Sequence, residues 1–222
     1  LFNPDGTDRE MKAVDSEHKK NILSDAWRIM QIERTSSNPK HPYSKFGTGC
    51  LETLSNKPKI RDVLLEFHSR YYSANLMRLV IYGKDSLDQL ETWASELFSD
   101  VPNKQANPPA WPPGELPLSA SELCSSVYIK TVKDMQTLVI AWQIEDLRKL
   151  YRTKPVASLC GFLGHEGPGS IMSLLRSNGW ATSLSAYANT DDGFGFFEVQ
   201  VELSDEGLNK HREIIELLFG YI

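Results

Sequence analysis

The stretch ATSLSAYANTDDGFGFFEVQVEL, residues 181–203, decides the fold. Residues 181–188 and 194–203 predict two antiparallel strands, and residues 189–193 form the turn that joins them. The segment QTLVIAW, residues 136–142, predicts a further strand because it is rich in β-branched and aromatic residues. The C-terminal half of the chain is therefore expected to contain an antiparallel sheet.

Helices are predicted before and after this hairpin in the sequence. They cover residues 155–163 and a segment from Ser170 to about Arg176 before it, and Ser204 opens a last helix after it. Helices that pack on a mostly antiparallel sheet define the α+β fold class. The sequence therefore predicts an α+β protein.

The N-terminal half predicts mainly helix. Residues 7–35 carry apolar side chains near the helical period, with Thr7 as the N-cap and Glu10 at the position that completes a capping box. Further helices are expected at residues 60–72 and after Ser86. Two more strands are predicted, at residues 76–82 and 126–132.

Residues 105–118 differ in composition from the rest of the chain. Five prolines lie there and exclude both a helix and a central strand; they are Pro108, Pro109, Pro112, Pro113 and Pro117. An extended linker is therefore expected, which divides the chain into residues 1–104 and 119–222.

Composition limits the functions that the chain can have. The formal net charge of -5 over 222 residues argues against nucleic-acid binding, and no apolar run approaches the ~20 residues that cross a membrane. Cys50, Cys124 and Cys160 are scattered and odd in number, which favours a reducing compartment and predicts a cytoplasmic location. Because the chain begins with Leu1, its native N-terminus is expected to lie upstream.

Glu17 is a candidate metal ligand, although a helical glutamate is ordinarily solvated. Zinc needs three or four ligands drawn from His, Cys, Asp and Glu. Only Asn21, a poor zinc ligand, follows at the spacing that shares a helix face, and no two of the five histidines are four residues apart. Glu17 is thus at most a single ligand that needs partners.

The glycine-rich segment 164–169 offers a second candidate site. Its glycines have the spacing of a phosphate-binding loop, and a helix follows. Ser170 stands where that motif needs lysine, so nucleotide binding is disfavoured. The simplest interpretation is a tight turn that opens a helix.

Four stretches together carry a resemblance to a known family. They are MKAVDSEHKKN at residues 11–21, NPKHPYSKFGTG at 38–49, FHSRYYSANLM at 67–77 and GHEGPGS at 164–170. In these stretches the chain resembles the insulysin branch of the pitrilysin-type metallopeptidases. Such enzymes take two zinc ligands and a general base from an inverted His-x-x-Glu-His motif, and a glutamate on a later helix is the third ligand.

The resemblance implies a zinc metalloendopeptidase that cleaves peptides in an enclosed chamber. Glu17 would be the third zinc ligand, and Glu10 would support the site, although a capping role for Glu10 is equally open. The motif itself would lie upstream, so this chain alone is expected to be inactive. Residues 1–104 would end the catalytic domain and residues 119–222 would begin a second, similar domain, both incomplete.

The resemblance also implies a surface that anchors the substrate's N-terminal end. It would consist of the glycine-rich turn and the following strand, with Gly164, His165, Glu166, Gly167, Gly169, Leu184, Ser185 and Ala186 as its residues. The family usually has glycines near Ala186 and Tyr187, where this chain departs from the pattern. The expected partners are peptide substrates, the remaining domains of the polypeptide and, as a further option, a second copy, with no nucleic acid or membrane. The alternative is a non-catalytic member that holds peptides or assists assembly.

Overall fold

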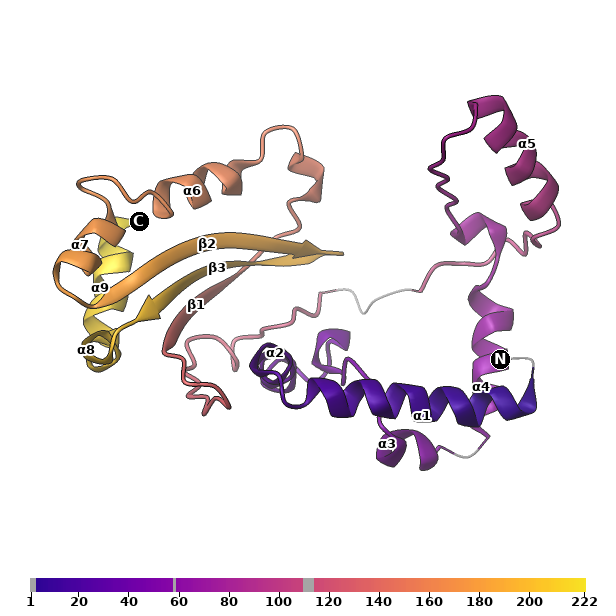
Figure 1. The fold of residues 1–222 in the computed structure, drawn as a ribbon, viewed down its shortest axis with the longest axis horizontal. Coiled ribbons are helices and arrows are strands. Elements are labelled where there is room, and N and C mark those ends of the chain that lie inside the picture. Colours follow the sequence, from indigo (N-terminus) through magenta and orange to yellow (C-terminus); the bar gives the residue numbers. More distant parts are fainter. Residues whose placement is uncertain (1–2, 58, 110–113) are drawn as a thin grey trace. The chain divides into compact units, whose positions relative to one another are not determined.

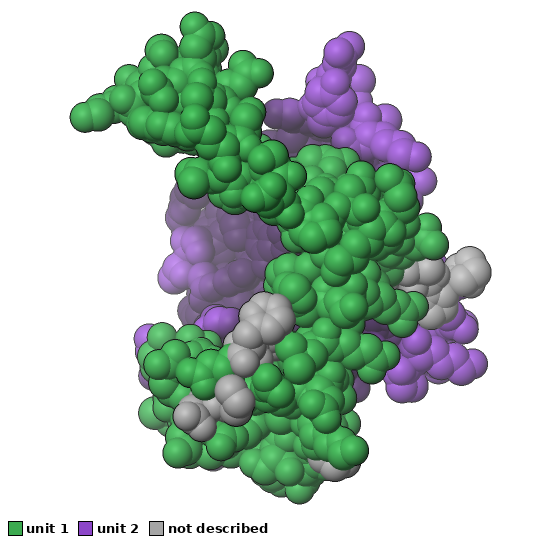
Figure 2. Space-filling view, turned by 90° about the vertical axis from the view of Figure 1, so that its right-hand side faces the viewer, with its two compact units in different colours: residues 1–24, 46–113 green, residues 25–45, 114–222 purple. Residues whose placement is uncertain are grey.

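The computed structural model describes residues 3–57, 59–109 and 114–222. The chain forms two compact units, one made of residues 1–24 and 46–113 and the other of residues 25–45 and 114–222 (Figure 2). The second unit contains an antiparallel sheet with helices packed on it. The predicted α+β class is therefore confirmed. Within the described ranges, no helix is both long and apolar enough to cross a membrane.

The described sheet has three strands in the order β1–β3–β2: β1 (Thr137–Ile144), β2 (Ala181–Asp191) and β3 (Phe194–Leu203). Both pairings are antiparallel, and β3 is central. An Asp192-Gly193 turn closes the hairpin, where Gly193 adopts φ +88°, a conformation that favours glycine. The predicted hairpin and the strand before it are thus present, but β2 continues past the predicted end at residue 188, because its pairing with β3 extends to Asp191.

One face of the sheet carries the core. Phe197, Val199, Val201 and Leu203 alternate along β3 toward the helices and are buried. The helices are α6 (Pro155–Leu163), α7 (Ile171–Ser177) and α9 (His211–Tyr221), and α6 runs along β2 (Figure 1). Their fully buried members include Leu163, Met172, Leu175, Ile214 and Leu218.

The last predicted helix is interrupted. Ser204 caps α8 (Asp205–Asn209) by accepting from the Gly207 amide, and α9 starts anew after Lys210. Gly207 packs so closely on the Trp180 backbone that a β-carbon there would lie 1.8 Å from the Trp180 carbonyl oxygen. Only glycine fits this contact.

The first unit contains α1 (Pro4–Asn21), α3 (Leu51–Ser55), α4 (Ile60–Tyr71), η2 (Ala74–Leu76) and α5 (Leu87–Phe98). Helices α4 and α5 agree with their predictions, and Ser86 caps α5 through the Gln89 amide. Thr7, in contrast, is not an N-cap. The helix has already begun before it, and its buried hydroxyl finds no partner in the described structure.

The prediction of one helix over residues 7–35 is wrong. The chain turns at residues 22–24, and α2 (Asp25–Thr35) with the following η1 (Pro42–Ser44) belongs to the second unit. Asp25 explains the break, because its buried carboxylate accepts from the amides of Val132 at 2.8 Å and Lys133 at 2.9 Å. A tertiary contact thus overrides the local helical pattern.

Neither residues 76–82 nor residues 126–132 form the strands that their composition predicts. Val80, Tyr82 and Tyr128 are among the most exposed apolar side chains of the described chain. A strand needs a partner for its backbone groups, and the structure describes none for either segment. High β propensity alone is therefore not enough to make either segment a strand.

The predicted linker is held near both of its ends. Near its start, the side-chain amide of Asn75 donates to the Ala106 carbonyl at 2.8 Å, in the first unit. Near its end, the backbone amide of Asn38 donates to the Pro117 carbonyl at 2.8 Å, in the second unit. Residues 110–113 of the linker lie outside the described residues, and the division at 105–118 stays a prediction.

Two neighbouring leucines on α7 provide a test of this core. Leu175 is 0% exposed and Leu174 is 43% exposed. Leu175→Ala should lower the free energy of unfolding by about 2–5 kcal/mol because it opens a cavity. Leu174→Ala should change it far less. Urea unfolding of the chain followed by circular dichroism measures both, and equal effects would contradict the packing described.

Asp25 provides a second test. The amides of Val132 and Lys133 hold the pKa of this carboxyl below its usual range. A carboxyl whose pKa is lower in the folded state stabilises the fold at pH values above its unfolded pKa of about 3.9. This stabilisation is lost as the pH falls through the pKa of the folded state. Hydrogen-exchange protection factors of Val132 and Lys133 should thus fall below about pH 4. Asp25→Ala should abolish them at neutral pH and leave the amides of β3 protected.

Candidate functional site

Glu10 and Glu17 lie on the exposed surface of α1, seven residues apart. Seven residues make two helical turns, so both carboxylates point from nearly the same face. Glu10 accepts from the Arg9 guanidinium at 3.1 Å. Glu17 has no hydrogen bond or ion pair with any described residue, which leaves its carboxylate available to an outside group.

Other side chains of α1 fix this helix in place. The Asp15 carboxylate accepts from the Leu51 amide at 2.9 Å and pairs with Lys19 at 2.6 Å, and the amide contact is the main reason that its pKa is lowered. His18 lies 3.1 Å from the Thr48 hydroxyl, and its ring contacts Phe46 edge-on. These contacts turn one side of α1 toward residues 46–51.

No metal site is complete within the described chain. Nowhere in residues 3–57, 59–109 and 114–222 do three His, Cys, Asp or Glu side chains gather closely enough to hold an ion. The Glu17 carboxylate is of a type that zinc accepts, so it fits the role of one ligand. Its co-ligands would have to come from outside these residues.

The glycine-rich turn joins α6 to α7 in the second unit, whereas Glu10 and Glu17 belong to the first. Gly169 adopts φ +84°, and Ser170 caps α7 by accepting from the Ser173 amide at 3.1 Å. The ring of His165 covers Gly167, where a β-carbon would lie 2.4 Å from Nε2. Glu166 pairs with Arg176 at 2.7 Å. The exposed turn is thus fixed by contacts to its own helices.

Leu184, Ser185 and Ala186 lie on β2, at the outer edge of the described sheet. The Leu203 amide donates to the Gln136 carbonyl, just before β1, at 2.7 Å. Because the backbone groups of successive residues point to opposite sides of a strand, the odd-numbered residues of β3 bond to β1 and the even-numbered ones bond to β2. Through the pairing Ser185↔Gln200, the backbone of Ser185 faces β3. The backbone groups of Leu184 and Ala186, as well as Ala188, therefore point to the unpaired edge.

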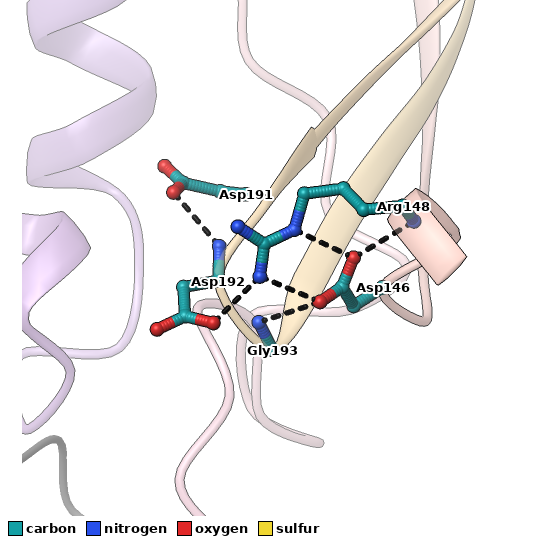
Figure 3. Close-up of polar contacts among 5 residues, drawn as sticks. All are labelled: Asp146, Arg148, Asp191, Asp192 and Gly193. Carbon is teal, nitrogen blue, oxygen red and sulfur yellow. Dashed lines mark hydrogen bonds and ion pairs between the residues drawn. The ribbon is translucent and has the colours of Figure 1, made fainter. Parts of the chain in front are cut away.

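Asp146, Arg148 and Asp192 form an ion-pair clamp at the end of β2 where the hairpin turns (Figure 3). Arg148, in η3 (Arg148–Leu150), donates to Asp146 at 2.9 and 2.7 Å and to Asp192 in the hairpin turn at 2.6 Å. The Arg148 contact is the main cause that holds the pKa of Asp146 far below its usual range. The clamp fixes the β2–β3 turn to the segment that follows β1.

The sequence alone does not predict this clamp. The predicted turn at residues 189–193 is a weak signal for it, and an arginine two residues after an aspartate is common on exposed surfaces. Asp192 lies 44 positions from Arg148, and only the antiparallel hairpin brings them together. The clamp therefore depends on tertiary structure.

Comparisons with known proteins agree with this architecture. The family model described as "Peptidase M16 inactive domain" matches residues 59–222. The whole chain is 44% identical to an insulin-degrading enzyme of Drosophila melanogaster and 42% identical to the A-factor-processing enzyme of Saccharomyces cerevisiae. It covers 23% and 22% of these two proteins, respectively.

Solved structures give the same result. The fold superposes on pitrilysin with a TM-score of 0.83 and 28% identity, over 100% of this chain and 24% of that one. A peptidase M16 inactive domain from Pseudomonas fluorescens, at 16% identity, shares the fold with a TM-score of 0.66, over 100% of this chain and 52% of that one. The chain belongs to the M16 peptidase family, in which it is similar to the insulin-degrading enzymes and to pitrilysin, and it spans less than a quarter of the length of those relatives.

Proposed function

We propose that the polypeptide to which this chain belongs is a zinc metalloendopeptidase that hydrolyses peptides in an enclosed chamber. The observation that carries the proposal is the exposed carboxylate of Glu17, which has no partner among the described residues, within a chain 44% identical to an insulin-degrading enzyme. A relative from Schizosaccharomyces pombe, 42% identical over the whole chain, has the name of a putative zinc protease, which supports the choice of metal.

Glu17 would bind the ion as an anionic oxygen ligand, and an upstream His-x-x-Glu-His motif would supply the rest. Bound zinc polarises a carbonyl and lowers the pKa of its water. Glu10 would act through its neighbours, because carboxylates behind a metal site orient its ligands. Its contact with Arg9 is compatible with that positioning role.

The chain would also hold the substrate. Gly164, His165, Glu166, Gly167 and Gly169 would receive the substrate's N-terminal end, and Leu184, Ser185 and Ala186 would add a peptide strand to β2. The unpaired backbone groups of Leu184 and Ala186 support this role, because strand addition relies on main-chain hydrogen bonds. The side chain of Ser185 would remain able to contact such a peptide.

The proposed location is the cytoplasm, and the proposed partners are peptides, the remaining domains and a second copy of the polypeptide. Cys50, Cys124 and Cys160 are free thiols, which suits a reducing compartment. A non-catalytic, peptide-holding member is the alternative, in which residues 59–222, matched to a domain described as inactive, would hold the peptide. Zinc content and activity of the full-length protein separate the two.

The zinc assignment can be tested in the full-length protein. Glu17→Gln should remove most activity and most bound zinc, because a neutral amide is a weak ligand that does not balance the charge of the ion. Glu10→Gln should lower activity on the order of 10–100-fold. Metal analysis together with peptide-cleavage rates gives both readouts.

Asp8→Asn is the matched control, since it removes an exposed carboxylate from the same helix. It should leave the zinc content and the rates unchanged. Full zinc content and full activity in Glu17→Gln would rule out Glu17 as the ligand.

The strand-addition role can be tested with two proline substitutions. Ala186→Pro removes an amide donor from the outer edge of β2 and spares the pairing with β3. Loss of one hydrogen bond, about 0.5–1.5 kcal/mol, should raise KM roughly 2–10-fold for long peptides and leave short ones unaffected. Ser185→Pro breaks a bond within the sheet and should lower Tm instead. The idea fails if Ala186→Pro, folded and zinc-loaded, treats long and short peptides alike.

A further inference from the structure

A groove of about 530 Å³ lies beside the outer edge of β2, between that strand and the η3–α6 segment. Ala186 and Ala188 line it on the strand side, and Tyr151, Lys154 and Val156 line it opposite. The short side chains of these two alanines leave space there, and Tyr187 and Thr190 complete the strand side of the groove. The groove therefore lies beside the backbone groups that the register leaves unpaired.

The ionised side chains that line the groove are all positively charged. Of the described residues that line it, two are ionised, Arg148 and Lys154, and both are cationic. Arg148 is already neutralised by Asp146 at 2.7 Å and Asp192 at 2.6 Å. Lys154 forms no ion pair with any residue in the described part of the chain. Its ammonium group is thus the uncompensated charge of the groove.

Local backbone structure fixes where this lysine lies. Lys154 adopts φ +44° at the N-cap of α6, followed by Pro155 at the first helical position. The clamp of Arg148 to the hairpin turn holds the other end of the same segment against β2. The backbone of Lys154 is thereby fixed at the wall of the groove, and the positive end of the α6 dipole adds to the charge of its side chain.

We propose that Lys154 gives this groove a preference for an acidic side chain in the peptide strand that pairs with β2. The proposal rests on the function proposed above and adds to it a class of substrate: extended peptides with Asp or Glu in the anchored segment. Side chains of an added strand alternate between the two faces of the sheet. Only acidic residues at alternate positions of the peptide should therefore reach Lys154.

The experiment uses the full-length protein and fluorescently labelled peptides that share one scissile sequence. Each carries a single Glu, Gln or Lys at successive positions of the N-terminal segment. Anisotropy with the Glu17→Gln variant measures affinity without cleavage, and initial rates with the unsubstituted enzyme give KM and kcat. Because exposed ion pairs are weak, Glu should bind about two- to fivefold more tightly than Gln, at alternate positions and at low salt only.

Lys154→Gln should abolish this difference, and Lys154→Glu should transfer the preference to the Lys peptides. Lys149→Gln is the matched control, because Lys149 belongs to the same segment but does not line the groove. It should retain the preference of the unsubstituted protein. The effect should appear in KM and not in kcat, which a general loss of stability would not produce.

The outcomes separate the two proposals. Equal affinity for Glu and Gln peptides at every position, or a preference that survives Lys154→Gln, would overturn the role of Lys154 even if every peptide is cleaved. Failure to cleave any peptide, with the Glu preference intact in the anisotropy measurement, would instead refute the peptidase and leave the groove as a peptide-binding site.

Discussion

The central position of β3 is the constraint on which the second unit depends. Val199 and Val201 are fully buried, and the same strand pairs with β1 on one side and β2 on the other. Because backbone groups alternate along a strand, one hydrogen bond from Leu203 to Gln136 determines which residues of β2 face outward. A shift of one residue would bury Ser185 and expose Leu184, and would also exchange the backbone donors at the outer edge. Core packing and the candidate peptide edge are therefore set by one register.

The sequence predicted most of the elements whose signals are local, although the Thr7 cap is not present. The Ser86, Ser170 and Ser204 caps each depend on residues a few positions apart, and all are present in the structure. The wrong predictions at residues 22–24 and 76–82 depend on distant partners. Asp25 ends one helix and begins another because of amides more than a hundred residues away. Residues 76–82 have strand composition, but the described chain offers no strand beside them.

The residues of the candidate site also differ in how far the sequence could predict them. Glu17 could be selected only through resemblance, since an exposed helical glutamate has no local signal that separates a ligand from a solvated side chain. The structure adds that its carboxylate has no partner among the described residues, whereas Asp15, two positions earlier, is engaged by Leu51 and Lys19. The groove beside β2 was not predictable at all, because Lys154 and Ala186 meet only after the hairpin has formed.

Each compact unit is built from two stretches of chain, and this has a consequence for synthesis on the ribosome. The Asp25 carboxylate bonds to an amide 107 positions later. At roughly 5–20 residues per second, α2 would wait on the order of 5–20 s before Val132 leaves the peptidyl-transferase centre. During that interval residues 46–113 are synthesised, and those that have left the ribosome can join α1. The N-terminal helix would thus acquire its neighbours first, and α2 would remain an unattached segment that depends on slow, long-range closure or on a chaperone.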